Sequence, residues 1–308
     1  MEFSHKPVML DEVLGFVPIN AKVALDLTVG GGNHAQGILK KYPDLFLYAI
    51  DRDAEAIASA GQKLAAFSHR IEFIHGPYSQ AIQHFLDLKI KADFILVDLG
   101  VSSKQLDDHS RGFSFRSDGP LDMRMNKEDT RTAADVINLI NEKDLMVLIK
   151  KYGEEIHARR IARNIVSFRD KHKFTSTRQL ADCIVQAVPV KYRYKRIHPA
   201  TKTFQALRIE VNHELDELNT LLDHLLQLLN PGGRVAIITF HSLEDRPVKH
   251  TFRHWTNPCQ CPTDLPICIC GLEPVAQLLN KKIITATKEE REVNPRSRSA
   301  KLRVAEKL

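Results

Sequence analysis

A short apolar run that leads into three consecutive glycines constrains the fold of this 308-residue chain more than any other feature. Residues 23–27 have the composition of a buried strand, Gly30, Gly31 and Gly32 follow, and residues 34–42 have a helical pattern. A strand, a glycine turn and a helix start together form a cradle for a nucleotide cofactor. Glycine is expected throughout the turn, because a Cβ would hold the backbone away from the ligand.

Strands and helices alternate through the first hundred residues. Strands are expected at 23–27, 45–50, 71–75 and 92–96, with helices at 34–42, 54–67 and 80–88 between them. This spacing predicts a parallel, doubly wound α/β sheet. A further buried strand is expected at 234–240, and later strands at 282–286 and 300–305.

The alternation stops between residues 102 and 198. A polar loop at 105–125 comes first, then helices are expected at 133–139, 142–152, 155–169 and 176–188, and one long amphipathic helix at 204–229. An insertion of about 90 residues is long enough for a small domain. The predicted division is a main domain in two parts, 1–104 and 201–308, around an inserted helical substrate-recognition domain at 105–200.

Composition limits the class of protein. Lys and Arg number 44 against 38 Asp and Glu, which gives a net charge of +6 and makes a polyanionic partner plausible. No apolar run approaches the roughly 20 residues that span a bilayer, and the N-terminus has no apolar signal segment. We therefore expect a cytoplasmic protein without a membrane partner.

The glycine turn alone fits a dinucleotide. Gly30-x-Gly32-x-x-Ala35, with Asp51 about 20 residues further on, matches the fingerprint of NAD-binding proteins, so an NAD-dependent oxidoreductase is one candidate. Asp26 argues for another ligand, because a carboxylate just before the turn would repel a pyrophosphate. It suits a ligand with cationic groups, such as the sulfonium and amine of S-adenosylmethionine.

Acidic residues end three of the predicted strands. Asp26, Asp51 and Asp98 stand at the ends of the first, second and fourth strands, and in open α/β sheets these ends converge on the ligand crevice. Asp51 can hold ribose hydroxyls with either cofactor. Tyr78 follows the third strand and could pack beside an adenine.

Six longer blocks carry a resemblance to a known family. They are DLGVSSKQLDD at 98–108, RGFSF at 111–115, DGPLDMRM at 118–125, HPATKTFQALR at 198–208, FHSLEDR at 240–246 and NPRSRSAKLR at 294–303. The chain resembles the bacterial MraW/RsmH family of 16S ribosomal RNA cytosine-N4 methyltransferases, nearly from end to end. The resemblance implies a class I (Rossmann-like) methyltransferase fold with a helical domain inserted between the fourth and fifth strands. It also implies S-adenosylmethionine as cofactor and a decoding-centre cytidine of the small ribosomal subunit as substrate.

The resemblance also assigns a cofactor site. Its positions in this chain are Gly32, Asn33, His34, Asp51, Tyr78, Asp98 and Gln105. Asn33 stands where glycine is common in the family, and Tyr78 where phenylalanine is common. Asparagine tolerates a positive φ better than most residues, and tyrosine keeps the aromatic face, so both assignments stand.

Asp98 and His241 are the candidates for the methyl-transfer step. Cytosine N4 is a poor nucleophile because its lone pair is delocalised, so the reaction needs an in-line approach and acceptors that orient the amine hydrogens. Asp98 is expected where cofactor and substrate meet, aided by the backbone carbonyls of Leu99 and Gly100. For His241 two interpretations stay open: a proton acceptor or RNA contact, and a hydrogen-bonded histidine that braces its loop.

Cations and aromatic residues of the insertion and its neighbouring loops are the expected RNA contacts. The cations are Arg111, Arg116, Arg124, Lys191, Arg193, Arg196, Lys202 and Arg208, and the aromatics are Phe113, Tyr192 and Tyr194. Naked 16S ribosomal RNA and the assembled small subunit are both compatible substrates, and the sequence does not fix the oligomeric state. A non-enzymatic RNA-binding assembly factor is an alternative, although intact strand-end acids and glycines argue against it.

Four of the five cysteines lie within twelve residues of one another: Cys259, Cys261, Cys268 and Cys270. Their two C-x-C pairs are more closely spaced than those of the usual zinc ribbon. Three interpretations stay open: a zinc site, disulfides under oxidising conditions, and a metal-free cysteine-rich loop.

Overall fold

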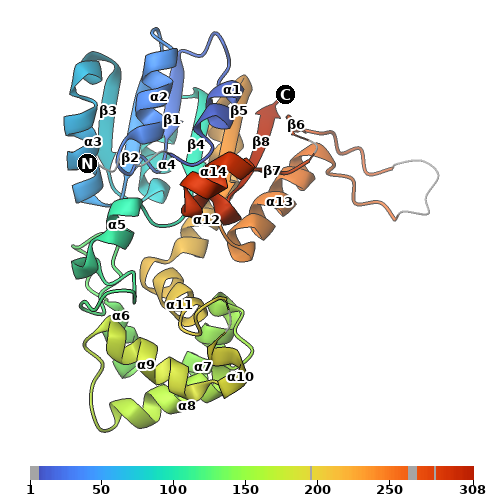
Figure 1. Ribbon diagram of the computed structural model, residues 1–308. Coiled ribbons are helices and arrows are strands. Elements are labelled where there is room, and N and C mark those ends of the chain that lie inside the picture. Colours follow the sequence, from blue (N-terminus) through green and yellow to red (C-terminus); the bar gives the residue numbers. More distant parts are fainter. Residues whose placement is uncertain (1–6, 195, 263–268, 281) are drawn as a thin grey trace. The chain divides into compact units, whose positions relative to one another are not determined.

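The computed structural model describes residues 7–194, 196–262, 269–280 and 282–308. The chain forms two compact units (Figure 1). The sheet unit comprises Met1–Gly100 and Glu217–Leu308, and the helical unit comprises Val101–Asp216. The helical unit thus extends beyond the 105–200 expected from the sequence and includes one further helix, α11 (Thr201–Asn212).

A mostly parallel sheet forms the centre of the sheet unit. Its strands are β1 (Val23–Asp26), β2 (Phe46–Asp51), β3 (Ile71–His75), β4 (Ala92–Asp98), β5 (Leu229–Thr239), β6 (Ala276–Leu278), β7 (Ile284–Thr285) and β8 (Lys301–Lys307). The strand order is β3-β2-β1-β4-β5-β8-β6, and β7 also pairs with β8. The first five strands of this order run parallel, whereas β8 is antiparallel to β5. The predicted doubly wound α/β sheet is confirmed.

Apolar cores form on both faces of the sheet. Helices α1 (Leu10–Phe16), α2 (Asn33–Lys41) and α3 (Ala54–Lys63) contribute to one core, and α4 (Tyr78–Asp87), α12 (Glu214–Leu228) and α13 (Ser242–Thr256) to the other (Figure 1). Side chains alternate between the cores, since Ala24 and Phe94 belong to the first and Leu25 and Ile95 to the second. Burial on both faces explains why the central strands are almost wholly apolar. Shorter helical segments are η1 (Ala65–Arg70), α14 (Lys288–Val293) and η3 (Pro295–Ser299).

The helical unit has a core of its own. Its segments are α5 (Ser103–Asp107), η2 (His109–Arg111), α6 (Ala133–Leu139), α7 (Glu142–Gly153), α8 (Ala158–Arg169), α9 (Thr177–Ala187), α10 (Val190–Arg193) and α11. Helix α7 packs against α8 and α11, and α8 packs against α9, around buried residues that include Phe174 and Leu207. Capping boxes begin α6 at Thr132 and α9 at Ser176, which satisfies the first backbone N–H groups of each helix.

The prediction of a single long helix at 204–229 is wrong. Helix α11 ends at Asn212, and His213 adopts a left-handed conformation with φ 51° before α12 begins. The buried Asn212 side chain accepts a hydrogen bond from the backbone N–H of Met125 at 2.7 Å and donates one to the carbonyl of Met123 at 2.8 Å. These contacts tie the helix end to the preceding loop. The amphipathic pattern continues across the break, so the sequence gives little sign of it.

Within the described ranges, no helix combines the length and the apolar character required to cross a bilayer.

Candidate active site

Three acidic residues lie at one edge of the sheet. Strand β1 is hydrogen-bonded to β2 on one side and to β4 on the other, and Asp26, Asp51 and Asp98 are the last residues of these strands. Because the strands are parallel, their carboxyl ends meet at the same edge. The structure therefore brings together the three acids that the sequence singled out.

The glycine turn lies beside these acids, between β1 and α2. Gly30 and Gly32 have φ values of 50° and 76°, in the left-handed region that favours glycine. The backbone N–H of Gly30 donates to Asp51 Oδ2 at 2.8 Å, which fixes the turn against the end of β2. A Cβ on Gly31, in contrast, would have only the Asn33 side chain near it, at 4.0 Å. The chain itself therefore leaves room for a Cβ on Gly31, and the need for glycine at this position to admit the ligand stays a prediction.

Gly32→Ala is expected to lower the free energy of unfolding by about 1–3 kcal/mol, whereas Gly31→Ala should change it by less than about 0.5 kcal/mol. A Cβ on Gly32 would combine a left-handed backbone with contacts at 3.2 Å to Leu64 Cδ1 and 3.3 Å to Ala60 Cβ. Urea titration of both variants measures the difference. Equal destabilisation would contradict this account of the turn.

Asp26 is the most deeply buried of the three acids, with 1% of its surface exposed. Its Oδ1 accepts a hydrogen bond from the Thr28 backbone N–H at 3.2 Å, but Oδ2 is buried with no donor among the described residues. Burial raises the pKa of Asp26 to about 7; the Thr28 hydrogen bond opposes this rise and the charge of Asp51 adds to it. A buried carboxyl oxygen without a donor is open to a hydrogen bond from a ligand or an ordered water.

Asp98 has a similar orphaned oxygen. Its Oδ1 is buried without a donor in the described part of the chain, while its backbone N–H donates to Thr28 Oγ1 at 2.7 Å. Burial raises the pKa of Asp98 to about 8, and repulsion from Asp26 and Glu244 contributes. A carboxyl group with such a pKa can change its protonation near neutral pH.

His34 lies next to Asp98 but forms no ion pair with it at neutral pH. Its Nε2 is 2.9 Å from the carbonyl of Val8, and its Nδ1 is 3.7 Å from Asp98 Oδ2. Burial lowers the pKa of His34 to about 4, so the ring is neutral at pH 7. A neutral ring that donates from Nε2 to Val8 presents an acceptor at Nδ1.

The other predicted cofactor residues of the sheet unit lie at the end of β2 and at the starts of α2 and α4. Asp51 Oδ1 accepts a hydrogen bond from the Asp53 backbone N–H at 2.9 Å, and burial raises the Asp51 pKa to about 6. Tyr78 begins α4 and packs, half-buried, against the core of that face. Asn33 begins α2, and its Oδ1 accepts a hydrogen bond from Lys63 Nζ of α3.

Gln105 and His241 have local structural partners. Gln105 belongs to the helical unit, where its side chain and Ser102 form the capping box of α5. His241 precedes α13 in the sheet unit, and its Nε2 lies 3.0 Å from Glu244 Oε1. This contact favours the bracing interpretation of His241, and its part in methyl transfer stays a prediction.

Thr28 and Glu244 also contribute to the site, although the sequence did not single them out. Thr28 positions the backbone of Asp98. Glu244 is 2% exposed, accepts hydrogen bonds from the backbone N–H groups of Phe240 and His241 at 2.7 and 3.3 Å, and adds to the raised pKa of Asp98. Glu244 lies in the block at 240–246, which was already singled out from the sequence. Nothing in the sequence, however, distinguishes a buried glutamate from an exposed one.

Several residues that were expected to contact RNA instead bind other residues of the helical unit. Arg111 is 3% exposed and donates to the carbonyls of Arg124 and Met125, and Phe113 is buried in the core, so the prediction that these two meet RNA is wrong. Arg208 forms a two-point ion pair with Glu214, with both distances 2.8 Å.

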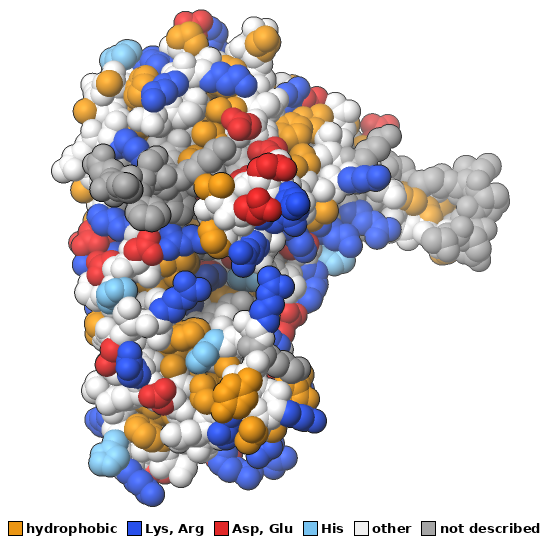
Figure 2. Space-filling model, viewed as in Figure 1, with side chains coloured by type: hydrophobic (Ala, Val, Ile, Leu, Met, Phe, Trp, Pro, Cys, Tyr) orange, Lys and Arg blue, Asp and Glu red, His pale blue; other side chains and the backbone are white. Residues whose placement is uncertain are grey.

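Other members of the predicted set reach the surface: Arg116, Lys191, Tyr194 and Arg196 are exposed. Figure 2 shows lysine and arginine side chains spread over the face in view.

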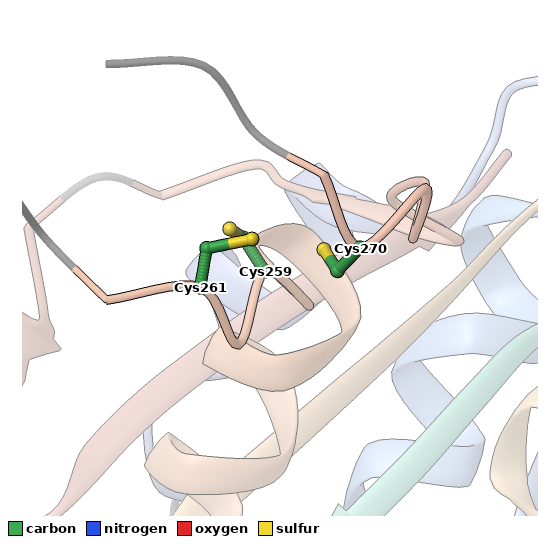
Figure 3. A group of neighbouring side chains, drawn as sticks. All are labelled: Cys259, Cys261 and Cys270. Atoms are coloured by element: carbon green, nitrogen blue, oxygen red, sulfur yellow. The ribbon is translucent and has the colours of Figure 1, made fainter. Parts of the chain in front are cut away.

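Three of the clustered cysteines lie together in the loop between α13 and β6. The sulfur atoms of Cys259, Cys261 and Cys270 are all within 4.8 Å of one another (Figure 3). Cys268 lies outside the described residues.

Comparison with known proteins assigns the family. Residues 2–308 match the MraW methylase family. The chain belongs to this family. A protein from Carboxydothermus hydrogenoformans is 47% identical over 310 residues, which cover 100% of this chain and 99% of that protein. One from Syntrophotalea carbinolica is 49% identical over 309 residues, which cover 99% and 98%. Both are named ribosomal RNA small subunit methyltransferase H.

Membership in the MraW family confirms the resemblance drawn from the six sequence blocks. The predicted fold, a Rossmann-like methyltransferase sheet with a helical insertion, is confirmed as well. The helical unit falls between β4, which ends at Asp98, and β5, which begins at Leu229.

Proposed function

We propose that this MraW-family protein is an S-adenosylmethionine-dependent methyltransferase of 16S ribosomal RNA that acts on N4 of a decoding-centre cytidine. The observation that carries the proposal is the pair of buried oxygens, Asp26 Oδ2 and Asp98 Oδ1, without donors among the described residues at the sheet edge. The names of the relatives support small-subunit RNA as substrate. The N4 position and the decoding centre rest on the sequence blocks shared with the family.

The residues at this edge suit S-adenosylmethionine. Its ammonium and sulfonium groups carry positive charge, which Asp26 and Asp98 can stabilise, whereas the same carboxylates would repel the pyrophosphate of NAD. Asp51 uses one lone pair on each oxygen for Gly30 and Asp53 and keeps others for ribose hydroxyls. The bound cofactor supplies an electrophilic methyl group.

Asp98 is assigned the role of orienting the cytosine N4 amine that accepts the methyl group. Its carboxylate would accept a hydrogen bond from the cytosine N4 amine and so direct the nitrogen lone pair toward the methyl group. The charge of the cofactor favours the ionised form of Asp98. When N4 gains a methyl group it must lose a proton, and a carboxylate whose pKa is raised by burial is suited to take it.

RNA binding is expected to depend on the exposed cations of the helical unit. The double variant Lys191→Ala/Arg196→Ala should reduce the slope of log affinity against log salt by about 1 to 1.5, since each phosphate contact to single-stranded RNA contributes about 0.7. Filter binding of a decoding-centre RNA fragment at several salt concentrations gives this slope. Lys143→Ala, an exposed cation on α7 of the same unit, serves as the matched control. An unchanged slope in the double variant would remove these residues from the RNA surface.

A transfer assay tests the proposed function. Small subunits and naked 16S RNA from cells without the protein are incubated with purified protein and S-adenosylmethionine carrying a labelled methyl group. We expect label on one cytidine in at least one of these substrates, and calorimetric binding of S-adenosylmethionine but not of NAD. Binding of NAD alone would favour the oxidoreductase alternative, and tight RNA binding without transfer would favour an assembly factor. The proposal places the protein in the cytoplasm, with the ribosomal subunits.

A further inference from the structure

Three thiol groups converge in a loop that the proposed methyl transfer does not use. Cys259 and Cys261 follow α13, Cys270 lies on the segment that returns toward β6, and Figure 3 shows Cys270 facing the other two. Their Sγ atoms are within 4.8 Å of one another. Eight residues of sequence separate Cys261 from Cys270, so the fold of the loop, and not sequence proximity, brings Cys270 to the pair.

The spacing of the sulfur atoms suits a tetrahedral metal site. A Zn–S bond is about 2.3 Å, so two thiolates on one tetrahedral zinc ion lie roughly 3.8 Å apart. The sulfur atoms would need to move by about 1 Å or less to reach this separation. A disulfide would use only two of the three cysteines and requires a sulfur–sulfur distance of about 2.05 Å.

The described part of this loop has little apolar packing to hold it. Its base is fixed, because the backbone N–H of Val275 donates to the carbonyl of Trp255 at 2.9 Å. Beyond the base, Ile269 and Leu272 are 78% and 46% exposed. A metal cross-link would therefore add to the stability of this loop.

The surroundings of Cys259 also suit an anionic metal complex. A surface hollow beside it is lined by His250, Arg253, His254 and Asn257. Three thiolates around Zn²⁺ carry a net charge of −1, and the guanidinium group of Arg253 offers a compensating charge.

We propose that Cys259, Cys261 and Cys270 bind one zinc ion through their thiolates, with a solvent molecule as the fourth ligand, and that the metal links the segment after α13 to the segment before β6. Each thiol releases its proton to solvent when it coordinates the metal. The proposal rests on these three residues alone, because Cys268 lies outside the described part of the chain. It is independent of the proposed methyl transfer, since it concerns metal binding and loop structure.

Zinc content and zinc affinity of the full chain test the proposal. Protein purified without chelators should contain about one zinc ion per chain. After removal of metal under reducing conditions, added Zn²⁺ should bind again, and Co²⁺ in its place should give the visible absorption of a tetrahedral thiolate complex. The double variant Cys261→Ser/Cys270→Ser should bind Zn²⁺ at least about 100-fold more weakly. Substitution of residues that only contact the metal ligands lowers affinity by roughly 10–100-fold, so a larger loss indicates that the ligands themselves are missing.

Cys183→Ser is the matched control. Cys183 is buried in α9 of the helical unit, with its Sγ 3.3 Å from Asn164 Nδ2, and this variant should retain full zinc content. Failure of the reduced wild-type chain to bind Zn²⁺ would overturn the proposal. So would equal zinc affinity in the double variant, or a disulfide between two of the three cysteines in the freshly purified protein.

Discussion

Asp98→Ala is expected to abolish methyl transfer, with a fall in kcat of at least about 1,000-fold, while the protein stays folded. The substitution removes the carboxylate assigned to orient the N4 amine and to take its proton. The fold should tolerate the change, because Oδ1 of Asp98 has no donor among the described residues and burial of its charge is unfavourable, as the raised pKa indicates. Single-turnover transfer at saturating cofactor measures the loss, and circular dichroism with urea unfolding checks the fold.

A second substitution of Asp98 separates its roles in binding and in proton transfer, and a variant at another acid serves as the control. Asp98→Asn keeps the shape of the side chain but cannot take a proton, so it should lose transfer while it retains more cofactor binding than Asp98→Ala. Asp87→Ala, an exposed acid at the end of α4, should leave kcat unchanged. Turnover of Asp98→Ala within about twofold of wild type would exclude Asp98 from the reaction, since loss of general acid–base help costs about 100-fold or more.

Asp26→Asn is expected to stabilise the cofactor-free protein at pH 8 and to weaken cofactor binding. Asp26 has a folded-state pKa of about 7 against an ordinary value of 3.8. The folded chain therefore binds more protons than the unfolded chain between these values, and the free energy of unfolding falls as the pH rises from about 4 to 8. Asparagine carries no charge, so the variant avoids this loss of stability. A pKa difference of roughly three between the folded and unfolded chains corresponds to a loss of up to about 4 kcal/mol. Urea unfolding should show the gain at pH 8 and none at pH 4.

The same substitution should change the proton balance of cofactor binding. In the wild type, a cationic ligand favours ionised Asp26 and Asp98, so binding should release protons near pH 7 and tighten as the pH rises from 6 to 8. Asp26→Asn should bind S-adenosylmethionine about 10–100-fold more weakly at pH 8, with less proton release. Calorimetry in two buffers of different ionisation enthalpy measures both quantities. Unchanged affinity and unchanged proton release would contradict a charge-stabilising role for Asp26.

Local sequence pattern predicted the first half of the sheet unit well because each strand there is a separate apolar run that ends in an acid or a turn. Strand β3 falls at the expected residues, as does helix α6 in the helical unit. The pattern failed where tertiary contacts decide the backbone, as at His213, where the side chain of Asn212 fixes the helix end. The prediction also lacked α13, whose interior Pro247 obscures its helical pattern.

The candidate site was predictable to the extent that chain topology places residues together. Asp26, Asp51 and Asp98 could be grouped because parallel strands share an edge. Burial and hydrogen bonding could not be read in the same way, so Arg111 was expected at the surface although its guanidinium group binds backbone carbonyls. The contribution of Glu244 to the pKa of Asp98 depends on the geometry of β5 and α13 and has no local sequence pattern.

The proposed activity is tested most directly by mass spectrometry of small-subunit RNA from cells with and without this protein. We predict that one decoding-centre cytidine lacks a methyl group on N4 when the protein is absent. The wild-type chain should restore the methyl group, and the Asp98→Ala variant should not. Identical modification of this RNA in both cell types would contradict the account.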